Sequence, residues 1–304
     1  MKLRQRCGYL LPGFNFRPFY FTMDKLIFTY QDRQLTLTEA SKCALYLTIG
    51  TESLTLMVLN PAQECLALQG WHFATASQHF EGAEPALRRI LGQEAIFTYP
   101  FRYVRYGFAN AQVTLVPNRL FRSEDLPSYF KLLLPAGDFV YRSEPLPDFD
   151  CHLVYALETS ALRICHRYFS NGAEVHLAGT LIRNFNKIAA GRDHAIFANI
   201  RNHMIQICVF ERQNLRYFNS FSWQHPNDLL YALLLVYDQF RLSPLDLPLQ
   251  VAGNLLQDSE VYRLLSRFIQ KIDFVALPNH VSLGAAANNL PPHCFFDLVC
   301  LKNN

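Results

Sequence analysis

The chain has 304 residues, of which 50% are apolar and 17% are charged, and its formal net charge is +3. A chain of this length can bury about 75% of the surface that it exposes when unfolded, and two lobes are expected. Its 25 Phe and 15 Tyr argue against a disordered chain, and 28 Lys and Arg against 25 Asp and Glu leave too little positive charge for a nucleic-acid binder.

Membrane-spanning and secreted classes are disfavoured as well. The most apolar run, 229–237, has nine residues, whereas a spanning helix needs about 20. The chain starts with basic residues, as a signal peptide does, but Arg17 and Asp24 interrupt the stretch after them and no clear cleavage site is present. The eight cysteines are scattered without a C-x-x-C pair, which predicts reduced thiols in a core. We therefore expect a soluble cytoplasmic protein.

Residues 1–43 are rich in Phe and Tyr and are predicted to form an irregular N-terminal extension. The simpler interpretation is that this segment packs on its own domain. Arginines among the aromatic residues leave a second interpretation open, an adaptor at a membrane surface, and a membrane would then be contacted only through this arm.

A strand–turn–strand–strand–helix pattern begins at residue 44. A branched aliphatic residue recurs at every second position over 45–49 and 54–58, and between them lie Gly50, Thr51 and Glu52. This is typical of a β-hairpin whose tip carries a glycine, a hydroxyl and a carboxylate. The other elements expected in this half are strands at 65–73, 113–117, 153–157 and near 175, helices at 84–93, 159–169 and 179–190, and a proline-rich insertion of mixed structure at 118–150.

The same pattern returns in the second half of the chain. The turns at Gly50 and Arg201 lie 151 positions apart, which favours a duplicated α/β domain over a solenoid, whose period is about 20–50 residues. The elements expected here are strands at 195–200, 205–209 and 215–221, a helix at 226–240, a strand at 247–251 ending in a turn at 252–254, a helix at 258–269 and a last strand at 295–301.

This plan resembles the actin-like superfamily, which includes actin, sugar kinases and the actin-like proteins of type IV pilus assembly. In that superfamily a hairpin in each half holds the nucleotide phosphates, and a later glycine-rich turn approaches the adenosine. Here 47–51 is similar to the first hairpin, 199–202 to the second and 251–254 to the adenosine turn. The resemblance implies a duplicated ribonuclease-H-like (actin-like ATPase) α/β fold with two lobes, 44–190 and 191–304, each a mixed sheet flanked by helices.

Several further stretches resemble motifs of one family. They are Val113–Pro117 with Leu120 and Phe121, Tyr217–Phe221, Asp228–Tyr231, Gln239–Leu242 and Leu249–Gly253. On these motifs the chain resembles an uncharacterised bacterial family, domain of unknown function 3822, over about residues 44–301. That family implies a divergent actin-like protein but no assigned activity, so the chemistry depends on the residues themselves.

The resemblance implies a site for ATP or ADP, but its catalytic carboxylates are missing. In nucleotide-hydrolysing relatives each hairpin contributes an aspartate that holds hydrated Mg²⁺ and orients water, and Mg²⁺ prefers such hard oxygen ligands. The matching positions here are Thr48 and Asn199, both neutral, which argues against hydrolysis. No catalytic residue or metal ligand is assigned. The residues that match the nucleotide site are Thr48, Gly50, Thr51, Asn199, Arg201, Gly253 and Asn254.

Two charged residues beside the hairpins have alternative interpretations. Glu52 could replace a lost metal ligand, and Asp193 is the other candidate, which would make the protein a nucleotide-dependent kinase or ATPase with a relocated metal site. The simpler interpretation of Glu52 is a solvent-exposed cap of the hairpin tip. Arg201 could pair with a phosphate, and the simpler interpretation is a strand-end charge in water.

The other groups of reactive residues give weaker evidence of function. Cys and His are adjacent at 151–152 and 165–166, but sequence neighbours point in different directions, so a thiol enzyme is disfavoured. The histidines show no metal-ligand spacing. We therefore expect a catalytically degenerate actin-like scaffold or protein-interaction module, with a cleft that is filled by side chains or binds nucleotide without turnover. A protein partner is expected on 118–150 or on a lobe edge, and a homodimer is compatible with the sequence.

Overall fold

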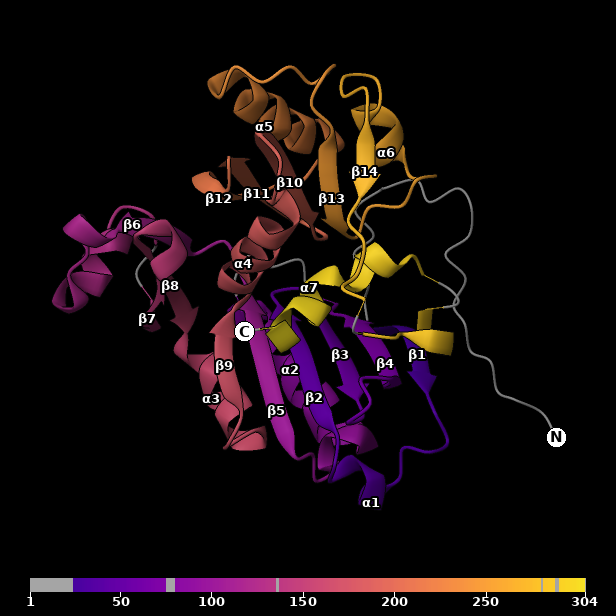
Figure 1. The fold of residues 1–304 in the computed structure, drawn as a ribbon. Helices are drawn as coiled ribbons and strands as arrows, with labels where there is room; N and C mark the ends of the chain where they lie inside the picture. The colour runs from indigo at the N-terminus through magenta and orange to yellow at the C-terminus, as the bar shows by residue number, and fades with distance from the viewer. Residues whose placement is uncertain (1–23, 75–79, 135–136, 280, 288–289, 304) are drawn as a thin grey trace.

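The computed structural model describes residues 24–74, 80–134, 137–279, 281–287 and 290–303. Two large β-sheets lie one above the other in Figure 1, and helices α4 (Leu177–Ala189) and α7 (Phe296–Cys300) lie between them. Helix α4 contacts β10 and β11 of one sheet and β5 and β9 of the other, while α7 contacts β2, β3 and β13. The two helices therefore connect both sheets.

The first sheet has six strands in the order β1–β4–β3–β2–β5–β9. Strands β2, β3 and β4 form an antiparallel meander, β5 pairs in parallel with β2, and β9 pairs in parallel with β5. Helices α2 and α3 pack against each other beside this sheet. The elements are β1 Lys25–Gln31, β2 Ala44–Gly50, β3 Ser53–Leu59, β4 Cys65–His72, β5 Tyr103–Ala109, β9 Ala173–His176, α1 Leu37–Ala40, α2 Phe80–Gln93 and α3 Thr159–Tyr168.

The second sheet repeats this topology in the order β12–β11–β10–β13–β14. Again three antiparallel strands are followed by two parallel ones, so β10 corresponds to β2, β13 to β5 and β14 to β9. The duplication and the mixed sheets predicted from the sequence are confirmed. The elements are β10 His194–Ile200, β11 Met204–Glu211, β12 Asn214–Ser222, β13 Leu249–Gly253, β14 Ile272–Phe274, α5 Pro226–Gln239 and α6 Glu260–Leu265.

The insertion belongs to a third, three-stranded sheet, β6–β8–β7, that projects to the left in Figure 1. Strands β6 (Val113–Pro117), β7 (Phe139–Leu146) and β8 (Cys151–Glu158) pair antiparallel. Short 3₁₀ helices lie between β6 and β7. Strand β6 also contacts β12 of the second lobe. Residues 118–150 thus contain short 3₁₀ helices and β7, and Phe149 of the insertion packs against Phe210 of β11.

Two secondary-structure predictions are wrong. Residues 296–300 form helix α7 rather than part of a last strand, because a short apolar run fits a buried helix and a buried strand equally well and here it lies between two sheets. The described part of the N-terminal extension is not irregular, since it forms β1 and α1, and Phe28 of β1 packs edge-on against Phe295. The membrane interpretation concerns residues 1–23, which lie outside the described residues.

The C-terminal segment shares its core with the first sheet. Phe296, Leu298 and Val299 are fully buried in an apolar cluster that contains the interior of β2 to β5 and also Phe197 and Phe210 of the second sheet. The other face of the second sheet forms a separate cluster with α5 and α6. The C-terminal segment thus packs between the two sheets. The lobe boundary at residue 190 stays a prediction.

The described cysteines are free thiols, and all except the half-buried Cys294 are buried. Burial raises the pKa of Cys151 to about 11 and that of Cys65 to about 12, so both thiols are protonated and unreactive. This agrees with the prediction of cysteines in the core. None of the described helices is long and apolar enough to cross a membrane.

Candidate functional site

The tips of the two equivalent hairpins, β2–β3 and β10–β11, face each other across a small cavity. Its volume is about 40 Å³, and since one water needs about 10–15 Å³ on this scale, it holds only a few water molecules. Gly50, Thr51 and Arg201, three of the residues that match the nucleotide site, line this cavity, and nucleotide binding by them stays a prediction. The complete lining is Gly50–Ser53, Ala109–Ala111, Arg201–Met204 and Ser222.

Arg201 connects three parts of the fold. It follows β10, and its guanidinium forms an ion pair with Asp297 of α7 and donates to Ser53 Oγ of the first hairpin at 3.2 Å. Its backbone is fixed as well, since Arg201 N–H donates to the Met204 carbonyl and Trp223 Nε1 donates to the Arg201 carbonyl. Arg201 is only 9% exposed, so its interpretation as a charge in water is wrong.

Glu52 lies on the opposite tip and is also buried, so its interpretation as a solvent-exposed cap is wrong. Its Oε2 is 3.7 Å from His203 Nε2 of the second hairpin, while His203 Nδ1 contacts the Trp223 carbonyl at 3.1 Å. Burial raises the pKa of the Glu52 carboxyl, and the charges of His203 and Arg201 oppose that rise. The acidic tip therefore faces the basic tip.

Thr48 and Asn199, the residues at the aspartate positions, lie behind the tips and are fully buried. Thr48 Oγ1 and Asn199 Oδ1 have no hydrogen-bond partner, and Asn199 Nδ2 makes only a long contact, 3.4 Å, to Gln206 Oε1 on the paired strand. Both residues occupy equivalent places in the two sheets, one on β2 and one on β10. Neither supplies the negative charge that would hold a divalent cation.

Gly253 and Asn254, predicted to approach adenosine, pack on the second hairpin. Gly253 has φ of +86°, and a Cβ there would fall on the Ile200 carbonyl oxygen, so only glycine fits. Asn254 N–H donates to that same carbonyl at 2.6 Å, and its side chain donates to Asn202 Oδ1 at 3.3 Å. The turn is thus joined to the hairpin by the chain's own hydrogen bonds.

Asp193 cannot act together with Glu52. It precedes β10, whereas the hairpin tip lies at the other end of that strand. Its side chain is exposed and pairs with Arg212 at 3.4 Å. Among the described residues no group of three or more His, Cys, Asp and Glu side chains could hold a metal ion. The relocated metal site would have to rely on Glu52 alone.

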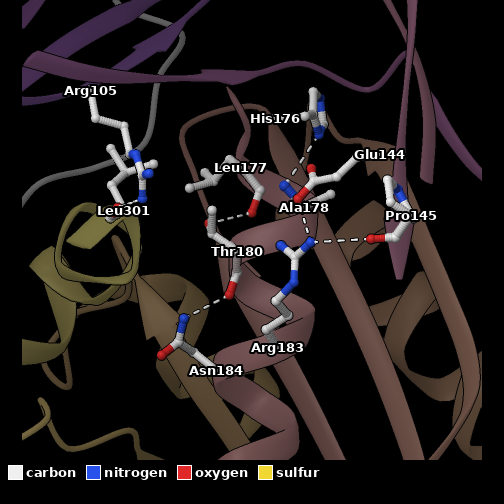
Figure 2. Close-up of polar contacts among 10 residues, drawn as sticks. All are labelled: Arg105, Glu144, Pro145, His176, Leu177, Ala178, Thr180, Arg183, Asn184 and Leu301. Atoms are coloured by element: carbon white, nitrogen blue, oxygen red, sulfur yellow. Dashed lines mark hydrogen bonds and ion pairs between the residues drawn. The ribbon is translucent and has the colours of Figure 1, made fainter. Parts of the chain in front are cut away.

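The cavity wall is linked to helix α4 through Asn110 and His176. Asn110 donates to the Ala156 carbonyl and contacts His176 Nε2 at 2.9 Å. His176 caps α4, because its Nδ1 accepts from Ala178 N–H (Figure 2). Burial lowers the pKa of His176 to about 3, so the imidazole is neutral and Nε2–H donates to Asn110 Oδ1.

Further along α4, Arg183 pairs with Glu144 of β7 and donates to the Pro145 carbonyl at 3.4 Å (Figure 2). Gly179 leaves room for this contact, since an added Cβ would lie 2.7 Å from Glu144 Oε2. The insertion is therefore attached by an ion pair to a helix that lies between the two sheets.

The sequence did not point to Ser53 or Asp297, and it placed His203 only among histidines without metal-ligand spacing. A carboxylate in the apolar run 295–301 is the signal that could have indicated Asp297, because a buried charge requires a partner. Nothing local indicates that this partner is Arg201, which lies 96 positions earlier.

Solved structures with the same fold support the duplicated architecture. A Bacteroides thetaiotaomicron protein described as having an actin-like ATPase fold and unknown function is 18% identical, with a TM-score of 0.69 over 80% of this chain and 94% of that one. A chain of the PilM–PilN type IV pilus biogenesis complex is 14% identical, with a TM-score of 0.59 over 86% of this chain and 98% of that one. The chain has the actin-like ATPase fold, as predicted.

At the level of sequence, no curated protein matches the chain. A family model does match, over residues 32–272, and the family is described as "Protein of unknown function (DUF3822)". That match covers most of the chain, including both hairpins and the insertion. The chain therefore belongs to the DUF3822 family, as its central and C-terminal motifs predicted.

Proposed function

We propose that this protein is a catalytically degenerate actin-like protein that serves as a cytoplasmic scaffold or protein-interaction module. The observation that carries the proposal is that the residues of the interlobe cleft bind one another. Arg201 contacts Asp297 and Ser53, and Glu52 faces His203. Because the guanidinium of Arg201 is already paired with Asp297, the one arginine among the described residues that line the cavity has little capacity left with which to bind a phosphate.

The chemistry of phosphoryl transfer argues in the same direction. That reaction depends on positioning and on Mg²⁺ to neutralise developing charge, and Mg²⁺ takes carboxylate, phosphate and water oxygens. Thr48 and Asn199 are neutral and fully buried, and the cavity between the tips is about 40 Å³. A Mg²⁺–nucleotide does not fit these residues, because neither supplies a negatively charged oxygen to the metal ion.

A role in protein interaction is supported by the surface of the insertion. Leu132 is 95% exposed, Leu133 is 69% exposed and Leu120 is 59% exposed. All three lie in the insertion, and large exposed apolar residues are a feature of interaction sites. A structural relative is found in the complex of PilM and PilN. The free buried thiols support a reducing, cytoplasmic location.

Thermal unfolding with nucleotide tests the proposal. The protein is unfolded alone, with millimolar ATP or ADP, and with each nucleotide plus Mg²⁺. A ligand at a hundredfold excess over its Kd would add about 2.7 kcal/mol, which shifts the midpoint by several degrees. We expect no Mg²⁺-dependent shift and no release of phosphate from ATP. A Mg²⁺-dependent shift accompanied by phosphate release would overturn the proposal.

The second candidate is a nucleotide-dependent kinase or ATPase that uses Glu52. It is favoured by one observation, that the carboxylate lies buried at the cavity with Oε2 lacking a hydrogen-bond partner. On this view Glu52→Gln abolishes phosphate release from ATP, while Asp193→Asn, at the exposed end of β10, leaves it unchanged. On our proposal neither variant has an activity to lose.

A further inference from the structure

The interlobe cleft contains a buried cation whose counterion comes from a distant part of the chain. Arg201 is 9% exposed and Asp297 is 5% exposed. Asp297 is the one charged residue of helix α7, whose other residues are Phe296, Leu298, Val299 and Cys300. All of them are buried, so the helix brings a single carboxylate into an apolar interface between the sheets.

The guanidinium reaches that carboxylate across the first hairpin. One of its nitrogens donates to Ser53 Oγ at 3.2 Å and lies 3.6 Å from where a Cβ of Gly50 would be. The guanidinium therefore packs within van der Waals distance of the Gly50 tip. Arg201, Gly50 and Ser53 all line the 40 Å³ cavity, so the cation has an aqueous side as well as the side that Asp297 covers.

Chemistry allows another anion at the same place. A guanidinium binds carboxylate and phosphate oxygens with the same donor geometry, and a buried cation requires some anion to compensate its lost hydration. The other carboxylate near Arg201 is that of Glu52, which faces His203. Asp297 is thus the group that decides whether the guanidinium has capacity for an external anion.

We propose that Arg201 forms a latent anion site in the cleft and that Asp297 occupies it as a ligand built into the chain, which excludes phosphate-bearing molecules. This inference rests on the proposed function and gives a reason why the cleft does not bind nucleotide. Nucleotide phosphates are excluded by the Asp297 carboxylate in addition to the loss of the metal ligands. Removal of that carboxylate uncovers a site for a small oxyanion of the carboxylate or phosphate class.

The test removes the carboxylate and supplies an anion from solution. Asp297→Ala leaves Arg201 unpaired and enlarges the space next to the cavity. Thermal unfolding is measured in sodium chloride, sodium formate and sodium phosphate at equal ionic strength and pH. We expect the unfolding midpoint of Asp297→Ala to fall by several degrees in chloride and to recover, with saturation, in formate and in phosphate, while the native protein responds to neither anion.

Two further variants make the result specific. Asp193→Ala removes an exposed carboxylate that also pairs with an arginine, Arg212, and its midpoint should be unchanged in all three salts. The double variant Asp297→Ala with Arg201→Met has no cation, so the response to formate and phosphate should disappear. If Asp297→Ala does not fold in chloride, the isosteric Asp297→Asn takes its place, and refolding yield in phosphate against chloride becomes the measurement.

The inference is overturned if the Asp297 variants respond to formate and phosphate no more than the native protein does, or if the double variant responds as strongly as the single one. It is also overturned if the native protein itself is stabilised by phosphate as strongly as the Asp297 variants. These outcomes are separate from a failure of the proposed function, which would be Mg²⁺-dependent phosphate release from ATP by the native protein.

Discussion

The two lobes share a strand order but carry opposite chemistry at their hairpin tips. The first tip has Glu52 and Ser53, an acid and a hydroxyl, and the second has Arg201 and His203, both basic. Each tip contacts the other through the Arg201–Ser53 hydrogen bond and the Glu52–His203 pair. The two copies therefore carry complementary groups at equivalent tips, and these groups contact each other.

The lobes also differ in what covers them. The first sheet has an additional edge strand, β1, carries the insertion, and shares an apolar core with the C-terminal segment and one face of the second sheet. The other face of the second sheet is covered by α5 and α6 in a separate core. Asp297 belongs to α7, which contacts both sheets, so the counterion for Arg201 comes from the segment between the lobes. The comparison predicts that the cross-lobe pairs contribute more to stability than contacts of similar type at the surface.

The largest loss of stability is expected when the buried cation Arg201 is replaced. Arg201→Met leaves Asp297 as an uncompensated buried carboxylate, and breaking a buried pair in this way costs about 3–5 kcal/mol. Denaturant unfolding of the variant checks the value. The exposed pair of Arg212 with Asp193 provides the control, since Arg212→Met should cost under about 1 kcal/mol.

The double variant Arg201→Met with Asp297→Leu refines this comparison. It replaces both charges by apolar groups of similar size, and such replacements are often neutral, so most of the lost stability should return. If the double variant is as unstable as Arg201→Met alone, the ion pair itself stabilises the fold, and the uncompensated charge does not explain the loss.

A smaller effect is expected at the turn that follows β13. Gly253→Ala puts a Cβ on the Ile200 carbonyl at a φ of +86°, whereas Gly191→Ala meets nothing within 4 Å at a φ of +77°. The two variants share backbone strain of roughly 1–2 kcal/mol, and only the first adds a steric clash. Urea unfolding should therefore give a larger loss for Gly253→Ala, and equal losses would contradict the close packing of this turn on the second hairpin.

The fold could be predicted because its information is local and repeated. Branched aliphatic residues at every second position in 45–49 and 54–58 mark strands that are buried, and the return of that pattern after 151 positions indicates duplication. Strands β5 and β7 were not predicted, because each contains a residue that interrupts the apolar alternation. In β5 this residue is Arg105, which donates to the Leu301 carbonyl at 2.9 Å, and in β7 it is Pro145.

The candidate site could be predicted only in part. Thr48 and Asn199 lie where the resemblance placed them because a strand position is fixed by the pairing register. The burial of Glu52 and Arg201 could not be predicted, because it depends on Asp297 and His203, and distant partners leave no periodic signal. A charge at a hairpin tip is normally solvated, and only tertiary contact reverses that expectation.

Helix α4, between the sheets, should lose stability in acid through its capping residue. Because burial lowers the pKa of His176 from 6.5 to about 3, the folded protein keeps this imidazole neutral while the unfolded chain protonates it. Its contribution is therefore complete above pH 6.5 and is lost as the pH falls toward 3, by about 1.4 kcal/mol per pH unit.

The variant His176→Asn measures this contribution, since asparagine retains an acceptor for the helix N-cap but does not titrate. Denaturant unfolding at pH 7, 6 and 5 should show a shallower loss of stability for the variant than for the native protein. His72 and His293, whose pKa values are also lowered by burial, are retained in both proteins and cancel in the difference. Parallel curves would contradict a neutral His176.

The smallest loss of stability is expected when the ion pair that attaches the insertion to α4 is removed. The Glu144–Arg183 pair attaches the insertion to α4. Both side chains are about one fifth exposed, at 21% and 23%, so solvent screens the pair and Glu144→Gln should cost about 1 kcal/mol or less. Hydrogen exchange of β7 amides gives a more direct measurement, because loss of the attachment should speed exchange there and leave β10 amides unchanged. If β10 amides also exchange faster, the insertion stabilises the interlobe cleft as well, and the asymmetry between the two lobes extends from their hairpin tips to the element that contacts both of them.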